Sequence, residues 1–121
     1  MMRLRLLIVD DNVHFLRAAR ALLEREGLDV AGMVSTADDA VRSSAELGPD
    51  AILVDVDLGD ESGFDVARRL TELSDAPVIL ISAYPEQDVA ELVSTSAAVG
   101  FLSKNRVSAQ AILEMLEGAG R

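Results

Sequence analysis

The sequence of 121 residues contains no cysteine, which excludes disulfide bonds, thiolate metal sites and cysteine nucleophiles. Aromatic residues are also scarce, with three Phe, one Tyr and no Trp, so Leu, Val, Ile and Ala have to fill the core. Apolar runs are short, and none approaches the roughly 18 residues that a membrane-spanning helix needs. We therefore expect a soluble, cytoplasmic protein without a membrane partner.

Positive charge is in short supply as well. The chain has 11 Lys and Arg residues against 21 Asp and Glu residues, which gives a net charge of -10 at pH 7. Such a surface repels nucleic acids and anionic membranes, so we expect no direct nucleic-acid binding. Half of the residues are apolar, which is enough for one hydrophobic core in a chain of this length. We expect a single domain over residues 1–121, with no output domain in this chain.

Short apolar stretches alternate with helical patterns along the whole chain. The apolar stretches predict buried strands over residues 4–9, 28–33, 50–54, 76–81 and 99–102. Helices are predicted over residues 12–26, 36–47 and 63–73, then from Pro85 at the first helical position, and finally around residue 112. This alternation predicts a three-layer α/β fold, in which helices cover both faces of a five-stranded parallel sheet.

Side chains that can take part in chemistry follow four of the predicted strands. They are the carboxylates of Asp10, Asp11 and Asp55, the hydroxyl of Ser82, which Ala83 follows, and the ammonium group of Lys104. Parallel strands end at the same edge of a sheet, where ligands bind, so we expect these residues to lie close together. Three carboxylates repel one another by about 4 kcal/mol per pair at 4 Å and an effective dielectric of 20, so they need a cation. Oxygen donors favour Mg²⁺, with Mn²⁺ as an alternative hard ion.

One divalent ion and the ammonium group of Lys104 neutralise the three carboxylates. If Asp55 becomes an acyl phosphate of about -2, the site carries about one net negative charge. The ion and Lys104 can stabilise that charge, while Ser82 donates a hydrogen bond. The residues therefore fit an aspartyl phosphate with Asp55 as the nucleophile.

The chain resembles the response-regulator receiver domains of two-component systems over essentially its whole length. The matching residues are Asp10 and Asp11, Asp55 followed by Leu58 and Gly63, Ser82 and Ala83, and Phe101 to Lys104. The resemblance implies a flavodoxin-like (βα)5 fold with strand order 2-1-3-4-5.

The resemblance also implies Mg²⁺-dependent phosphoryl transfer to Asp55. The donor would be a sensor histidine kinase, a phosphotransfer protein or a small phosphodonor. The metal would be held by the side chains of Asp10, Asp11 and Asp55 and by the backbone carbonyl of Asp57. Such a protein is a switch that releases its phosphoryl group slowly, and we do not expect a multiple-turnover enzyme.

Phosphoryl oxygens would be bound by Lys104, Ser82 and the backbone of Ala83. The resemblance implies that Ser82 and Phe101 then shift together and change the face formed by the fourth helix and the fifth strand. That face would control an output domain or a downstream protein, with transcription as one target process. The resemblance also implies that two copies of the chain can form a homodimer through the fourth helix, the fifth strand and the fifth helix.

Two positions depart from the family pattern. Gly59 stands four residues after Asp55, where proline is common, so we expect a more mobile loop and weaker metal binding before phosphorylation. Asn105 follows Lys104, where the family often has proline in a cis bond. A cis bond before another residue costs about 3 kcal/mol, so we expect a trans bond and some displacement of Lys104.

Two alternatives remain open. Asp55 and Asp57 form a D-x-D pattern like that of haloacid-dehalogenase-type phosphatases, although that family places the pattern on its first strand. The second alternative is a receiver-like interaction module that is never phosphorylated in the cell. Asp60 is expected to be a solvated loop residue, and His14, the one histidine, is given no role.

Overall fold

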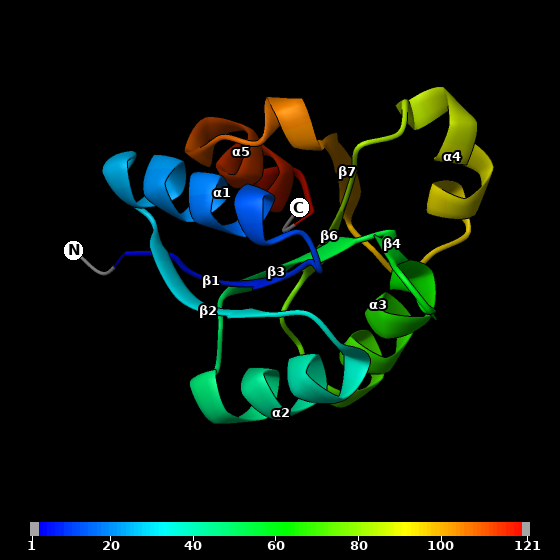
Figure 1. Ribbon diagram of the computed structural model, residues 1–121, viewed down its shortest axis with the longest axis horizontal. Helices are drawn as coiled ribbons and strands as arrows, with labels where there is room; N and C mark the ends of the chain where they lie inside the picture. Colours follow the sequence, from blue (N-terminus) through cyan, green and yellow to red (C-terminus); the bar gives the residue numbers. More distant parts are fainter. Residues whose placement is uncertain (1–2, 120–121) are drawn as a thin grey trace.

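A five-stranded parallel sheet lies between two helical layers in the computed structural model, which describes residues 3–119 (Figure 1). Its strands are β1 (Arg5–Val9), β2 (Asp29–Val34), β3 (Ala51–Asp55), β6 (Val78–Ser82) and β7 (Gly100–Ser103). The order across the sheet is β2-β1-β3-β6-β7, and every neighbouring pair is parallel. Counted along the chain, this is the order 2-1-3-4-5, so the predicted fold is confirmed.

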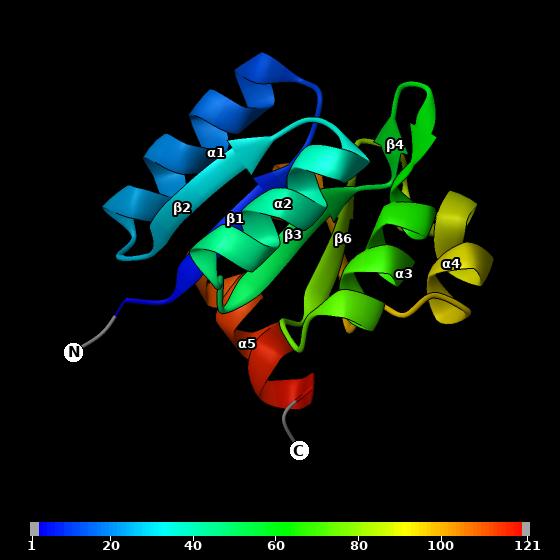
Figure 2. The ribbon, with the colours of Figure 1, turned by 90° about the horizontal axis from the view of Figure 1, so that it is seen from below.

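Each face of the sheet has its own hydrophobic core. The helices α1 (Val13–Arg25) and α5 (Ala109–Ala119) cover one face, and α2 (Ala37–Leu47), α3 (Gly63–Leu73) and α4 (Glu86–Ser94) cover the other (Figure 2). Every residue of β3 and β6 is buried, which explains why these strands appear as continuous apolar runs in the sequence. The site described below therefore stands on the two most enclosed strands.

Side chains cap the starts of three helices. The capping residues are Asn12, Thr36 and Ser62, which accept hydrogen bonds from the backbone N–H groups of Phe15, Asp39 and Phe64. The prediction for the fourth helix was wrong by one position. Pro85 precedes the helix with an extended ψ of 143°, and the helix begins at Glu86. The proline ring fixes φ near -65° and leaves ψ free, so the local sequence does not decide between the two positions.

A small hairpin after Asp55 was not predicted. It pairs β4 (Asp57–Leu58) with β5 (Glu61–Ser62) in antiparallel fashion. Gly59 takes the first position of its two-residue turn with a φ of +73°, the left-handed value that type II′ turns require there. A proline ring cannot adopt this angle, which gives a physical reason for glycine in place of the family's proline. Greater mobility of this loop stays a prediction.

A short 3-10 helix, η1 (Lys104–Arg106), follows β7 and was not predicted either. All peptide bonds within residues 3–119 are trans, so the expectation for the bond between Lys104 and Asn105 is confirmed. Among the helices that the structure describes, none has the length and apolar character to cross a membrane.

Candidate functional site

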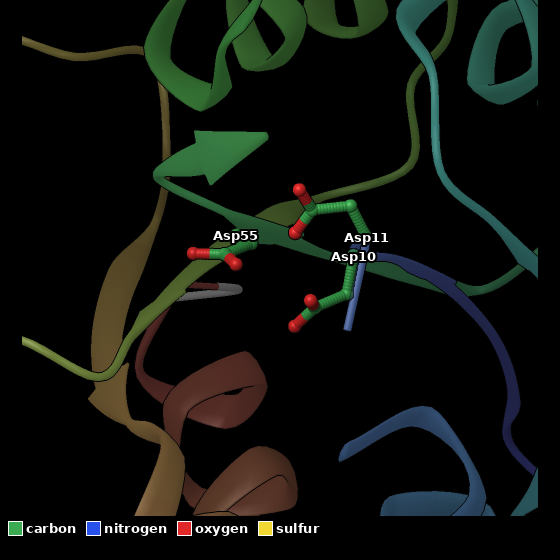
Figure 3. Close-up of side chains that lie close together, drawn as sticks. All are labelled: Asp10, Asp11 and Asp55. Atoms are coloured by element: carbon green, nitrogen blue, oxygen red, sulfur yellow. The ribbon is translucent and has the colours of Figure 1, made fainter. Parts of the chain in front are cut away.

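Three carboxylates meet at the carboxyl ends of β1 and β3, as the sequence predicts. Figure 3 shows the side chains of Asp10, Asp11 and Asp55 turned towards a common space. Each offers one oxygen that lies within 4.8 Å of the others. Asp10 is fully buried and Asp55 is 5% exposed, whereas Asp11 is exposed to solvent. Adjacent parallel strands thus bring together residues that are more than 40 positions apart in the chain.

Backbone N–H groups orient the two buried carboxylates. The N–H of Asn12 donates to Oδ1 of Asp10 at 2.8 Å, and the N–H of Asp57 donates to Oδ1 of Asp55 at 3.1 Å. Each aspartate therefore forms a local turn two residues long, a conformation that this side chain favours. The second oxygen of each carboxylate is left to face the site.

Lys104 pairs with both of these second oxygens. Its Nζ lies 2.7 Å from Oδ2 of Asp10 and 3.0 Å from Oδ2 of Asp55. Only 15% of the Lys104 side chain is exposed, so solvent screens these pairs weakly. The side chain reaches the carboxylates although Asn105 follows it, and the expected displacement of Lys104 relative to the family stays a prediction.

Ser82 ends β6, directly beside β3, and its side chain is fully buried. Its Oγ accepts a hydrogen bond from the N–H of Tyr84 at 2.9 Å, so its own O–H remains able to donate. Ala83 is exposed. Phe101 is 8% exposed and packs in the core beneath α3 and α4, so it is a core residue in the unphosphorylated protein.

Asp57 is exposed, and its carboxylate accepts a hydrogen bond from the N–H of Gly59 at 3.1 Å. The side chain therefore serves the turn of the hairpin, while the backbone carbonyl stays the candidate metal donor. Asp60 is exposed, as expected, and His14 is exposed as well.

Two residues near the site were not predicted from the sequence. The Phe15 ring lies under Nζ of Lys104, with 4.6 Å between Nζ and the ring centroid. The only signal for it was its place in the first turn of the helix that follows the acidic pair. Glu61 of the hairpin accepts a hydrogen bond from the N–H of Ala37 at 2.9 Å, which ties the segment after Asp55 to the start of α2. No sequence pattern indicated that contact.

The environment shifts the pKa values of the paired groups. Burial raises the pKa of Asp55 from its usual 3.8 to about 6, against the lowering effects of the Asp57 hydrogen bond and of Lys104. Burial also opposes the charged form of Lys104, but its hydrogen bonds and ion pairs with Asp10 and Asp55 outweigh that effect and raise its pKa. One ammonium group against three carboxylates leaves two negative charges uncompensated. A hard divalent cation with oxygen ligands fits this donor set and this charge.

The raised pKa of Asp55 predicts how the stability of the metal-free protein depends on pH. Between about pH 4 and pH 6 the folded state binds more protons at Asp55 than the unfolded state, so the free energy of unfolding falls as the pH rises. From this group we expect a loss of about 2 kcal/mol between pH 4 and pH 7. Asp55→Asn should lack this loss, so its stability relative to wild type rises with pH.

Urea unfolding of both proteins in the presence of a chelator measures this difference. Asp60→Asn is the matched control, because it removes an exposed carboxylate from the same loop. Parallel stability curves for wild type and Asp55→Asn would contradict the raised pKa of Asp55.

Comparison with known proteins gives consistent matches. A family model described as the response regulator receiver domain matches residues 6–117. The transcriptional regulatory protein LiaR of Bacillus subtilis is 28% identical over 109 residues, which cover 88% of this chain and 52% of LiaR. This chain spans about half the length of that relative, and less of several others.

Solved structures show the same likeness. The receiver domain of the putative response regulator NarL from Mycobacterium tuberculosis has a TM-score of 0.83 at 26% identity, over 98% of this chain and 99% of that one. A response regulator from Burkholderia pseudomallei, solved with a phosphorylated aspartic acid, a calcium ion and citrate, has a TM-score of 0.77 at 27% identity, over 93% of this chain and 65% of that one.

These matches do not favour the phosphatase alternative, because the matched family model covers nearly the whole chain and describes a receiver. The five-stranded sheet has the receiver order, and the acidic residues lie at the edge where the fold binds ligands. The chain therefore belongs to the family of response regulator receiver domains, which act as phosphorylation-dependent switches in two-component signalling.

Proposed function

We propose that Asp55 accepts a phosphoryl group from a sensor histidine kinase, a phosphotransfer protein or a small phosphodonor. The observation that carries this proposal is the pairing of the buried Asp55 carboxylate with Lys104 at 3.0 Å, beside two further carboxylates. One oxygen of Asp55 forms a bond to phosphorus while the bond between phosphorus and the donor nitrogen or oxygen breaks. The product is an acyl phosphate on Asp55, and the donor leaves with the electron pair of the broken bond.

The carboxylates of Asp10, Asp11 and Asp55 and the backbone carbonyl of Asp57 would hold Mg²⁺, or Mn²⁺ in its place. When bound, the ion supplies positive charge beside the transferred phosphoryl oxygens. The all-oxygen donor set supports this assignment, and so does the Burkholderia pseudomallei relative, which holds a calcium ion together with a phosphorylated aspartic acid. Asp10 also keeps Lys104 in place through its ion pair of 2.7 Å.

The other side chains would bind and sense the phosphoryl group. Lys104 exchanges its contact with Asp55 Oδ2 for a phosphoryl oxygen, and the O–H of Ser82 and the backbone of Ala83 bind further oxygens. Ser82 and Phe101 then move together. None of the residues of α4 is fully buried, so few packing contacts oppose a shift of this helix.

The shifted face of α4 and β7 would control an output domain or a downstream protein in the cytoplasm. Regulation of transcription would then come from a DNA-binding region outside these residues, because the net charge of -10 disfavours direct contact with DNA. The homodimer through α4, β7 and α5 stays a prediction. The domain itself is a switch and turns over no substrate beyond its own phosphoryl group.

Acetyl phosphate with Mg²⁺ tests this function directly. We expect wild type to gain about 80 Da, the mass of one phosphoryl group, in intact-mass spectra. Asp55→Asn should show no adduct, whereas Asp60→Asn, which changes an exposed carboxylate of the same loop, should react as wild type does. A folded wild-type protein that gains no mass would overturn the proposal. Sustained hydrolysis of phosphate monoesters that is lost in Asp57→Asn would instead indicate a phosphatase.

A further inference from the structure

The aromatic ring of Phe15 forms one wall around the ammonium group of Lys104. Nζ lies over the ring at 4.6 Å from its centroid, within the range of a cation–π interaction. Phe15 belongs to the first turn of α1, where its N–H donates to the capping side chain of Asn12 at 3.1 Å. It also packs against the core beneath α1 and α5. The hydrogen bond holds the backbone that carries the ring, and the core contact packs the ring itself before any ligand binds.

Lys104 has little other support on its own segment. It starts the 3-10 helix η1, and the two residues that follow it in this helix are exposed. A lysine side chain has four rotatable bonds, so holding its ammonium group in one place has a high entropic cost. In the unmodified protein the carboxylates of Asp10 and Asp55 hold it at 2.7 and 3.0 Å. Phosphorylation of Asp55 changes the second of these partners, and among the described residues Asp10 and the ring then remain as its unmodified contacts.

We propose that Phe15 is a positioning residue for phosphoryl binding, because its ring face holds the ammonium group of Lys104 beside Asp10 and Asp55. This inference rests on the proposed function of Asp55. The negative face of the ring attracts the cation, and the attraction is stronger at this site because Lys104 is largely shielded from water. The ring also occupies space that water would otherwise take next to the ammonium group.

Fluorinated phenylalanine at position 15 separates this attraction from simple packing. Stepwise fluorination withdraws electron density from the ring face and nearly preserves its shape. With mono-, di- and trifluorophenylalanine we expect the rate of acetyl phosphate labelling to fall step by step, about three- to tenfold in total. The same series at Phe64 is the matched control, because that residue is also partly buried but packs in the opposite core. Phe15→Tyr should retain the rate of wild type, and Phe15→Leu should lose about as much as the trifluoro variant.

A second measurement needs neither metal nor phosphodonor. In NMR spectra of the unmodified protein, the Cε protons of Lys104 should show an upfield ring-current shift that disappears in Phe15→Leu. A third measurement uses beryllofluoride, a mimic of the phosphoryl group on an aspartate, in the presence of Mg²⁺. In the Lys104→Met background, Phe15→Leu should cause no further loss of affinity for it.

The outcomes distinguish the two proposals. If wild type forms no adduct, the proposed function of Asp55 fails. If wild type is labelled normally while the fluorinated series at position 15 is flat, the cation–π role of Phe15 is wrong and the function stands. A loss with Phe15→Leu but a flat fluorinated series means that the ring acts through its shape, which also overturns this inference.

Discussion

Lys104→Met is expected to weaken binding of beryllofluoride, a mimic of the phosphoryl group on an aspartate, by about hundredfold. The substitution keeps most of the side-chain volume but removes the positive charge that lies 3.0 Å from Asp55. A charged donor aimed at phosphoryl oxygens in a shielded site contributes about 2 to 4 kcal/mol, and each 1.4 kcal/mol corresponds to a factor of about ten. Calorimetric titration in the presence of Mg²⁺ measures the affinity.

Arg106→Met is the matched control for this experiment. It removes a basic residue from the same short helix η1, but Arg106 is exposed and its charge is solvated. We expect its affinity for beryllofluoride to stay within about twofold of wild type, since screened surface charges contribute little. An equal loss in both variants would mean that general charge and not the placement of Lys104 controls binding.

Lys104→Met should also lower the free energy of unfolding. Without Lys104, the fully buried Asp10 loses its only cationic partner among the described residues. Removing one member of a buried ion pair costs about 3 kcal/mol or more, so we expect a loss of that order in the metal-free protein at neutral pH. Added Mg²⁺ should restore part of it by supplying positive charge, which urea unfolding with and without the ion would show. A metal-free variant as stable as wild type would contradict the ion pair.

Gly63→Ala is the second change with a large expected effect, a loss of about 3 kcal/mol in the free energy of unfolding. Gly63 begins α3, and its N–H donates to the carbonyl of Val56 at 2.9 Å. A Cβ atom here would overlap the backbone carbonyl of Asp55 and come within 2.6 Å of the Cα of Val56. Backbone atoms cannot rotate away as side chains do, so either α3 or the strand that carries Asp55 has to move.

The substitution should therefore damage the site as well as the fold, and weaken beryllofluoride binding together with stability. Gly118→Ala is its matched control, because a Cβ there meets no atom within 4 Å and the residue lies in α5. Alanine is favoured over glycine in a helix by up to about 1 kcal/mol, so this variant should be as stable as wild type or more stable. A Gly63→Ala protein with wild-type stability would contradict the close approach of α3 to Asp55.

The positions of Asp10, Asp11 and Asp55 could be predicted from the sequence, because an apolar run marks a buried strand and a polar residue marks its end. Ser82 and Lys104 followed from the same argument on the later strands. The pairing of Lys104 with Asp10 was not predicted, because Asp10 was expected to act only as a metal ligand. Which carboxylate an ammonium group contacts depends on side-chain directions from three separate elements, and periodicity carries no information about those.

The sequence by itself determined the order of strands and helices, the two-sided burial of the sheet, and the residues that reach its carboxyl edge. These features depend on hydrophobic patterns within windows of about ten residues, where solvent exclusion acts on each segment separately. Only the tertiary structure decided the hairpin around Gly59, the contact of Glu61 with Ala37, the Phe15 ring beside Lys104 and the raised pKa of Asp55. Each of these depends on groups from different segments at distances of a few ångströms, and on the desolvation that their meeting produces.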